Sequence, residues 1–336
     1  MDKRVRRRLV AALSALYVVA LVSYSLAFGI PAYTVGLSVW IIAALCIVAV
    51  ASPKRRVIQV FLDWLPFMVV LFAWYASRGI AVKLNRPVQV SAPVDIDRAI
   101  GFGHVPTVWL QQQLHIQDGS THVWQVIPTL IYISHFIAAP VVAAVLWVKN
   151  RGAWIAFLKR FATLMIAGLI TYIIVPWAPP WRAASFGLLP PLHRSVGDGW
   201  QYLHLRTAGD MLEVGQAGVN LDAAMPSLHC GLSLLIVLFL WRRVKPGWRV
   251  VLAAYAFGMA FTLVSGAEHY VNDVLAGWLY AVVVHYVWNR LEERSAGRTR
   301  AKRTGTRQQP APSRPLTGAP ADGAAERPVE HDPVLD

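Results

Sequence analysis

Eight long runs of apolar residues constrain the fold of this chain more than any other feature of its sequence. They occupy residues 9–29, 33–52, 57–77, 126–148, 153–176, 228–242, 250–267 and 271–290. A helix of about 20 apolar residues crosses the roughly 30 Å hydrocarbon core of a bilayer. The composition agrees, because 56% of the residues are hydrophobic and only 15% are charged. We therefore predict an all-α fold, a polytopic membrane helical bundle of about eight transmembrane helices, of which 228–242 is the shortest.

The formal net charge of +14 would favour nucleic acid as the partner of a soluble protein, so the position of the basic residues decides its meaning. Of the 32 Lys and Arg residues, 25 lie at the chain ends or between alternate pairs of apolar runs, in segments 1–8, 51–56, 148–160, 242–249 and 290–336. This is the positive-inside pattern. It predicts a multi-pass protein of the cell membrane with both termini cytoplasmic, and it leaves no need for nucleic acid as a partner.

Three regions follow from this topology. We predict two additional N-terminal transmembrane helices in residues 1–56, a six-helix core in 57–293, and a disordered cytoplasmic tail in 294–336, where apolar residues are too few to fold. The first apolar run could also be read as a cleavable signal peptide. It is longer than the roughly 7–15 apolar residues of such signals, so we expect an uncleaved anchor.

Two long segments, 78–125 and 177–227, are predicted to lie outside. The stretch 94–115 mixes apolar and polar residues, which suits a helix lying in the membrane interface. The second segment contains three tryptophans among prolines and histidines, and we expect an ordered cap near the lipid headgroups. Loops of this length are usually functional.

The stretch "SGAEHYVNDVLAG", residues 265–277, carries the first candidate catalytic pair. His269 and Asp273 are four residues apart, so on a helix they share one face and the carboxylate can reach the ring. An aspartate in that position fixes the tautomer of the histidine and leaves its other nitrogen free to attack.

The stretch "MPSLHCGLSL", residues 225–234, lies at the same predicted depth and on the same side. Pro226 suits the first turn of a helix, where the free amides and the Ser227 hydroxyl would form an anion site. His229 follows within that turn. The stretch "VPWAPPWR" lies at the outer end of the predicted span 153–176, and its Arg182 can pair with phosphate oxygens. Together these residues predict a site for a lipid phosphate.

The two motifs "PSLH" and "HYVND", about 40 residues apart, resemble the second and third motifs of the type 2 phosphatidic acid phosphatase superfamily. Leucine in "PSLH", the "HY" pair and the "PWAPPW" exit are similar to the branch that contains inositol phosphorylceramide synthases and inositolphosphotransferases. The resemblance covers roughly residues 57–290. It implies a lipid phosphatase or phosphotransferase that needs no metal and no cofactor.

The resemblance also implies a role for each matching residue. His269 would be the nucleophile that forms a phosphohistidine, and Asp273 would orient it. His229 would protonate the leaving group, and Ser227 would hold phosphate oxygens.

Two cations of the family pattern are missing from this chain. The first motif keeps Arg182, but Val175 stands where the pattern has lysine, and Leu263 stands where the third motif has arginine. Replacement cations are expected among the basic residues predicted outside. These are Arg78, Lys83, Arg86 and Arg194, and Arg78 is the preferred substitute.

Asp63 and His135 lie within predicted spans and leave a transporter or flippase open as a remote alternative, because charged groups in lipid often mark pathways. His135 could equally be a buried hydrogen-bond partner. No pair of broken spans in matching halves supports a transporter.

We therefore predict an integral membrane enzyme with an extracytoplasmic site that cleaves or transfers a phosphoryl or phospho-headgroup unit of a lipid phosphate through a phosphohistidine. A plain lipid phosphate phosphatase is the alternative, because the sequence leaves the acceptor open. The predicted partners are a lipid phosphate substrate and membrane lipids; the donor lipid and the oligomeric state are not predicted.

Overall fold

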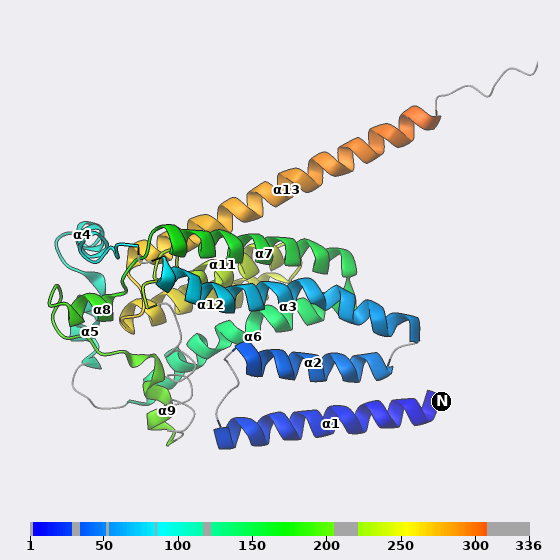
Figure 1. Ribbon diagram of the computed structural model, residues 1–336, viewed down its shortest axis with the longest axis horizontal. Coiled ribbons are helices and arrows are strands. Elements are labelled where there is room, and N and C mark those ends of the chain that lie inside the picture. The colour runs from blue at the N-terminus through cyan, green and yellow to red at the C-terminus, as the bar shows by residue number, and fades with distance from the viewer. Residues whose placement is uncertain are drawn as a thin grey trace, which may run out of the picture. The chain divides into compact units, whose positions relative to one another are not determined.

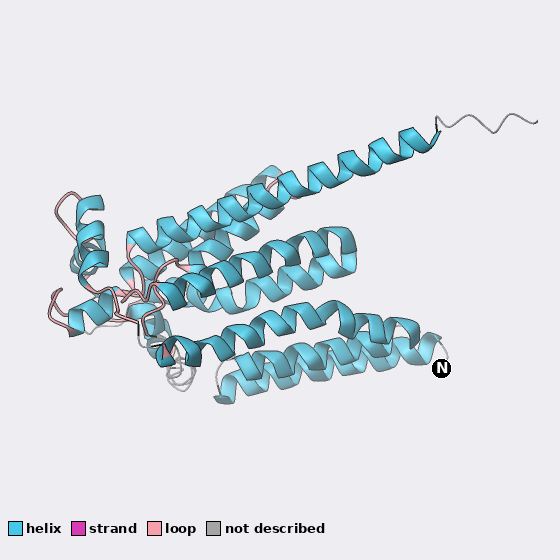
Figure 2. Ribbon diagram, turned by 45° about the horizontal axis from the view of Figure 1, so that its top comes forward, coloured by secondary structure: helices cyan, strands magenta, loops and turns pink. Residues whose placement is uncertain are grey.

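The computed structural model describes residues 3–28, 34–51, 54–84, 86–116, 122–204 and 221–307, and within these ranges every regular element is a helix (Figure 2). The longer helices are α1 (Lys3–Phe28), α2 (Thr34–Ala51), α3 (Lys54–Lys83), α6 (Val126–Lys149), α7 (Arg151–Ile174), α11 (Leu228–Leu240), α12 (Pro246–Ser265) and α13 (Val271–Arg307). The shorter ones are α4 (Ser91–Ile100), α5 (Pro106–Gln113), η2 (Val123–Gln125), α8 (Pro180–Ser185), η3 (Ser195–Gly197) and α9 (Asp198–Tyr202).

Each of the eight predicted spans corresponds to one of the longer helices, so the prediction of an all-α membrane fold is confirmed. Four helical segments in the described part of the chain are long and apolar enough to cross a membrane. They are Arg4–Ser25, Val123–Lys149, Arg151–Ile174 and Pro246–Ser265. The apolar segments Ile58–Val70 and Leu228–Leu240 are shorter.

Residues 1–290 form one compact unit. Within it α2 packs on α1 and α3, α3 packs on α7, and α6, α7, α11 and α12 pack on one another. The largest cluster of buried apolar side chains lies between these helices and includes Phe157, Phe161, Leu235 and Phe239.

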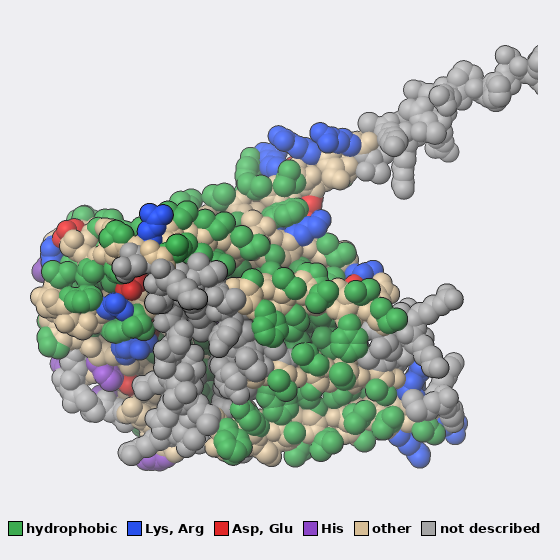
Figure 3. Space-filling model, viewed as in Figure 1, with side chains coloured by type: hydrophobic (Ala, Val, Ile, Leu, Met, Phe, Trp, Pro, Cys, Tyr) green, Lys and Arg blue, Asp and Glu red, His purple; other side chains and the backbone are tan. Residues whose placement is uncertain are grey.

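The outward faces of the same helices are apolar as well, and Figure 3 shows hydrophobic side chains over their sides. Val18, Leu62, Ile170, Phe257 and Leu279 are each more than half exposed. In water such a surface would drive association. On spanning helices it is the surface that lipid covers.

The short helices α4, α5, α8 and α9 gather at one end of the long helices, and the N-terminus lies at the other end (Figure 1). The stretch 94–115 forms α4 and α5 rather than one helix. Gly101 ends α4, Phe102 and Gly103 have positive φ angles of 53° and 99°, and Pro106 begins α5. The prediction of one continuous helix was wrong because this Gly-x-Gly turn reverses the chain.

Three extended segments far apart in the sequence lie side by side at this end. The Gln89 N–H donates to the Pro176 carbonyl (2.9 Å), and the Trp177 N–H donates to the Asp222 carbonyl (2.7 Å). The Ala224 N–H in turn donates to the Trp177 carbonyl (3.1 Å). These bonds hold the chain that leaves α7 beside the chain that enters α11.

Residues 291–336 form a separate unit. The structure continues α13 as a helix to Arg307, whereas the sequence predicts a disordered tail from residue 294. The segment 291–307 is rich in Arg, Lys, Glu and Ala, which favour helix without an apolar core. Residues 308–336 lie outside the described residues.

Candidate active site

His269 and Asp273 stand at the junction between α12 and α13. The N–H groups of Glu268 and His269 both donate to the Leu263 carbonyl (3.0 and 3.1 Å), which folds the junction tightly onto the end of α12. His269 Nδ1 lies 3.4 Å from Asp273 Oδ2, and the same oxygen accepts a bond from the Tyr270 N–H (2.9 Å). His269 is 6% exposed and Asp273 is fully buried. The predicted contact is therefore present, but it does not arise from a shared helical face, because His269 precedes α13, which begins at Val271.

Ser227 is the N-cap of α11, and its hydroxyl oxygen accepts from the Cys230 N–H (3.4 Å). Pro226 was predicted within the first turn of the helix. It instead precedes the N-cap of α11, because the capping hydroxyl belongs to Ser227, the next residue. The Ser227 N–H donates to the Asp273 carbonyl (2.9 Å), and the Tyr172 hydroxyl donates to the Pro226 carbonyl (2.6 Å). The two candidate motifs are thus hydrogen-bonded to each other.

Close backbone contact between α11 and α13 fixes the same junction. A Cβ added at Gly277 would lie 2.2 Å from the Ser227 carbonyl oxygen, and one added at Gly231 would lie 2.9 Å from the Gly277 carbonyl oxygen. Only glycine permits this approach.

The His229 ring faces the nucleophile candidate, with its centroid 5.7 Å from that of His269. It stacks on Tyr132 at 5.4 Å with an interplanar angle of 19°, and Phe136 meets it edge-on at 6.1 Å. Nε2 of His229 is buried and has no hydrogen-bond partner among the described residues. A substrate atom in this space would satisfy it.

His135 also belongs to this cluster, which the sequence analysis did not predict. Its ring centroid lies 4.1 Å from that of His229. Tyr132, His135 and Phe136 are spaced i, i+3 and i+4 on α6, and this spacing puts all three on the face toward α11. That spacing was the available signal.

Two of the candidate cations, Arg182 and Arg194, are engaged in ion pairs. Arg182 Nε is 2.9 Å from Asp222 Oδ1, and Arg194 makes a two-bond pair with Glu268 at 2.8 and 3.0 Å. Burial raises the pKa of the Asp222 carboxyl, while Arg182 lowers it. The side chains of Arg78 and Lys83 are not among those that the structure describes, and Arg86 is exposed.

Leu263, which replaces the arginine of the family pattern, is fully buried. It packs in an apolar cluster with Tyr132, Cys230 and Met259. This position therefore contributes to the core rather than to charge.

Asp97 of α4 was missed by sequence reasoning. It is fully buried, and its Oδ1 accepts from the Asn272 N–H (3.1 Å) in the first turn of α13. The Asn272 side chain donates back to the Pro93 carbonyl (2.9 Å). Burial raises the pKa of Asp97 to about 6, against the opposing effect of the Asn272 N–H. An aspartate from another helix thus caps the helix that carries Asp273.

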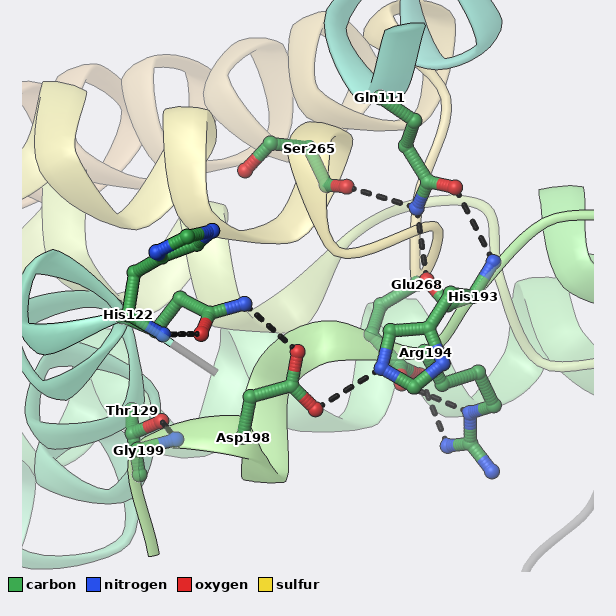
Figure 4. A network of polar contacts seen from close by, with 10 residues as sticks. Gln111, His122, Thr129, His193, Arg194, Asp198, Gly199, Ser265 and Glu268 are labelled. Carbon is green, nitrogen blue, oxygen red and sulfur yellow. Dashed lines mark hydrogen bonds and ion pairs between the residues drawn. The ribbon is translucent and has the colours of Figure 1, made fainter. Parts of the chain in front are cut away.

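A polar network on the same side holds the outer segments together (Figure 4). Asp198 accepts from the Gln125 side chain (2.8 Å) and contacts His193 Nε2 (2.9 Å). The hydrogen bond to Asp198 raises the pKa of His193. Gln111 donates to the carbonyls of His193 and Ser265 (2.6 and 2.9 Å). Because Ser265 ends α12, the network also braces the junction that carries His269.

Asp63 does not contact the residues of the candidate site and has its own partners. Its carboxylate accepts from the Trp147 indole N–H (2.9 Å) and pairs with Arg151. A carboxylate held by two such groups links α3 to the junction of α6 and α7, which explains it as a structural residue. Among the described residues no three His, Cys, Asp or Glu side chains are grouped as metal ligands would be.

Comparison with known proteins gives one family match. The family model described as the PAP2 superfamily matches residues 94–287, more than half of the chain. The matched region begins within α4 and includes the outer segments, α11 with His229, and the junction before α13 that carries His269. No solved structure matches the chain.

Three curated relatives are similar to parts of the chain. The inositol phosphorylceramide synthase catalytic subunit aur1 of Schizosaccharomyces pombe is 21% identical over 247 residues, which cover 72% of this chain and 56% of the relative. The inositol phosphorylceramide synthase of Candida albicans is 28% identical over 49% of this chain and 36% of the relative. The phosphoinositol dihydroceramide synthase of Bacteroides thetaiotaomicron is 27% identical over 38% and 43%. The matches thus span about half of these relatives or less.

Proposed function

Because this chain belongs to the PAP2 superfamily, we propose that it is a membrane enzyme that transfers the phospho-headgroup of a lipid to a hydroxyl acceptor. The names of the three relatives point to a phosphoinositol headgroup as the unit transferred and to the hydroxyl of a ceramide-like lipid as the acceptor. One observation carries the proposal. His229 and the His269–Asp273 pair, from separate helices, meet in one largely buried cluster.

The first half of the proposed reaction forms a phosphohistidine. His269 donates its Nδ1–H to Asp273, so the lone pair on Nε2 is free to attack the phosphorus of the donor lipid. As the N–P bond forms, the bond between phosphorus and the lipid oxygen breaks. His229 gives its proton to that departing alkoxide. The products are a neutral lipid alcohol and headgroup phosphate bound covalently to His269.

The second half reverses these roles. The acceptor hydroxyl gives its proton to His229 and attacks phosphorus, and the N–P bond breaks to release His269. Phosphoryl transfer depends mainly on positioning and charge stabilisation. In this proposal Ser227, Arg182 and Arg78 supply contacts to the phosphate oxygens.

The site is proposed to lie outside the cytoplasm. The N-terminal segment, with five Lys and Arg residues in its first eight positions, lies at the opposite end of the unit from the short helices near the site (Figure 1). A basic cytoplasmic end supports an extracytoplasmic site.

The test uses purified protein with phosphatidylinositol, phosphatidate or a polyprenyl phosphate, each with and without ceramide. The expected result is a new phospholipid and diacylglycerol from the first donor, both lost in His269→Ala. Release of free phosphate without a new lipid would establish the plain phosphatase instead. No consumption of any donor would refute the proposed function.

A further inference from the structure

We propose that His135 is a third imidazole of the substrate site, and that it hydrogen-bonds the phosphate of the bound lipid beside His229. This inference rests on the proposed function and names an additional binding residue for it. It goes beyond the two histidines of the family motifs.

The position of His135 supports a contact with ligand. Its ring lies 4.1 Å from the His229 ring at an angle of 40°, the shortest ring contact that His229 makes. Although His135 stands in the middle of α6, its side chain is partly exposed, as is that of His229. Two adjacent rings thus each keep some accessible surface.

The hydrogen bonding of His135 leads to the same conclusion. No residue that the structure describes hydrogen-bonds its ring, whereas Ser134, its neighbour on α6, bonds both the Ile131 carbonyl and the Tyr255 hydroxyl. A polar ring left unpaired inside a membrane helix bundle is costly. A phosphate oxygen accepts readily from an imidazole N–H.

The lysine and arginine of the family pattern are missing from this chain, which leaves a phosphate-binding role open for His135. Leu263 is part of the apolar core, Arg194 is paired with Glu268, and Arg182, which the proposed function places at the phosphate, shares its charge with Asp222. The phosphate therefore needs a further donor close to His229 and His269. His135 lies beside His229 and can provide one whether its ring is neutral or protonated.

A purely structural role predicts a different result upon substitution. Phenylalanine at position 135 keeps a flat ring against His229 but removes both nitrogens, whereas asparagine loses the ring and keeps an N–H donor. Ile137 offers a control on the same helix, because its apolar side chain is 40% exposed and carries no hydrogen-bonding group. Ile137→Leu changes α6 and leaves the ring contacts of His229 in place.

The experiment measures kcat/KM of His135→Phe, His135→Asn and Ile137→Leu on alkyl and aryl esters of the same headgroup phosphate. Loss of a charged hydrogen bond predicts a decrease of about 10- to 100-fold in His135→Phe on both esters. His135→Asn should recover part of this activity, and Ile137→Leu should stay near the parent.

A binding measurement separates this inference from the proposed function. Orthovanadate should raise the thermal stability of the parent and of Ile137→Leu, with an apparent affinity about 10-fold or more weaker in His135→Phe. A parent that binds vanadate through His135 but consumes no lipid would refute the function and keep the site. Equal vanadate affinity in His135→Phe and the parent would overturn the inference, as would a loss confined to the alkyl ester, which means that His135 acts only through His229.

Discussion

His229 lies on α11 and His269 lies in the junction between α12 and α13, and their placement assigns different tasks to two chemically identical side chains. Only His269 has a carboxylate at its Nδ1, which suits a nucleophile. His229 is enclosed by Tyr132, His135 and Phe136, and its buried Nε2 has no partner among the described residues, which suits a group that exchanges a proton with substrate. The two roles make different demands on the leaving group.

Substitution of each histidine should therefore give a different pattern. A general acid contributes about 10²–10⁴-fold, but only when the leaving group needs a proton. His229→Ala should lose activity on this scale with an alkyl ester and recover part of it with an aryl ester that leaves unprotonated. His269→Ala should be inactive on both and form no acid-labile phosphoenzyme. An equal loss of kcat/KM on the two esters in His229→Ala would contradict the acid role.

Asp97 predicts a dependence of stability on pH. Its pKa is raised to about 6 in the folded protein, so between about pH 4 and 6 the folded state binds the proton more tightly than the unfolded state. Stability from this group is therefore gained as the pH falls through 6 and lost as it rises. From pH 7 to pH 5 the gain is about 1 kcal/mol.

Asp97→Asn should remove that gain, because asparagine keeps an oxygen for the Asn272 N–H but does not titrate. The measurement is thermal unfolding in detergent at pH 5 and pH 7, followed by tryptophan fluorescence. Asp95→Asn is the control, since Asp95 is exposed on the same helix and pairs only with Arg98 among the described residues. If all three proteins respond identically to pH, Asp97 does not titrate in this range.

At the scale of elements, the contact of α11 with α13 holds the two motifs together. It depends on Gly277, where even a methyl group would meet the Ser227 carbonyl at 2.2 Å. A main-chain oxygen cannot move aside without moving the helix, so we expect Gly277→Ala to destabilise the protein by about 1–3 kcal/mol. Activity should fall as well, because the shift separates His229 from His269.

Gly297→Ala on the same helix is the matched control. A Cβ at position 297 meets nothing within 4 Å, so this variant should keep the stability and turnover of the parent. Wild-type melting temperature and turnover in Gly277→Ala would mean that α11 and α13 do not approach as described.

The elements also show what sequence can and cannot predict. Apolar length alone located the eight long helices. The four-residue spacing of His269 and Asp273 predicted their contact, because the two residues are close in sequence, although His269 lies just before α13 and not on it. Asp97 and His135 could not be assigned in the same way. Asp97 meets Asn272 across 175 residues, and His135 meets His229 across 94, so their partners depend on how helices pack. The Arg182–Asp222 and Arg194–Glu268 pairs were missed for the same reason.

At the scale of the whole molecule, the distribution of charge and the arrangement of the helices predict the same orientation of the protein in the membrane. The basic segments that begin α1 and α12 are predicted to be cytoplasmic, and α5 and α8 belong to the opposite end of the unit (Figure 1). Ser185 and Gln112 are exposed at that end, and Gly247 is exposed at the start of α12. These positions allow the orientation to be measured.

Single cysteines at Ser185, Gln112 and Gly247 should be introduced with Cys46 replaced by serine, since Cys46 is exposed and Cys230 is buried. In intact cells an impermeant maleimide should label Ser185→Cys and Gln112→Cys but not Gly247→Cys. After permeabilisation all three should react, which controls for accessibility. The reverse pattern in intact cells would place the site in the cytoplasm, and the donor headgroup would then have to be drawn from the inner leaflet.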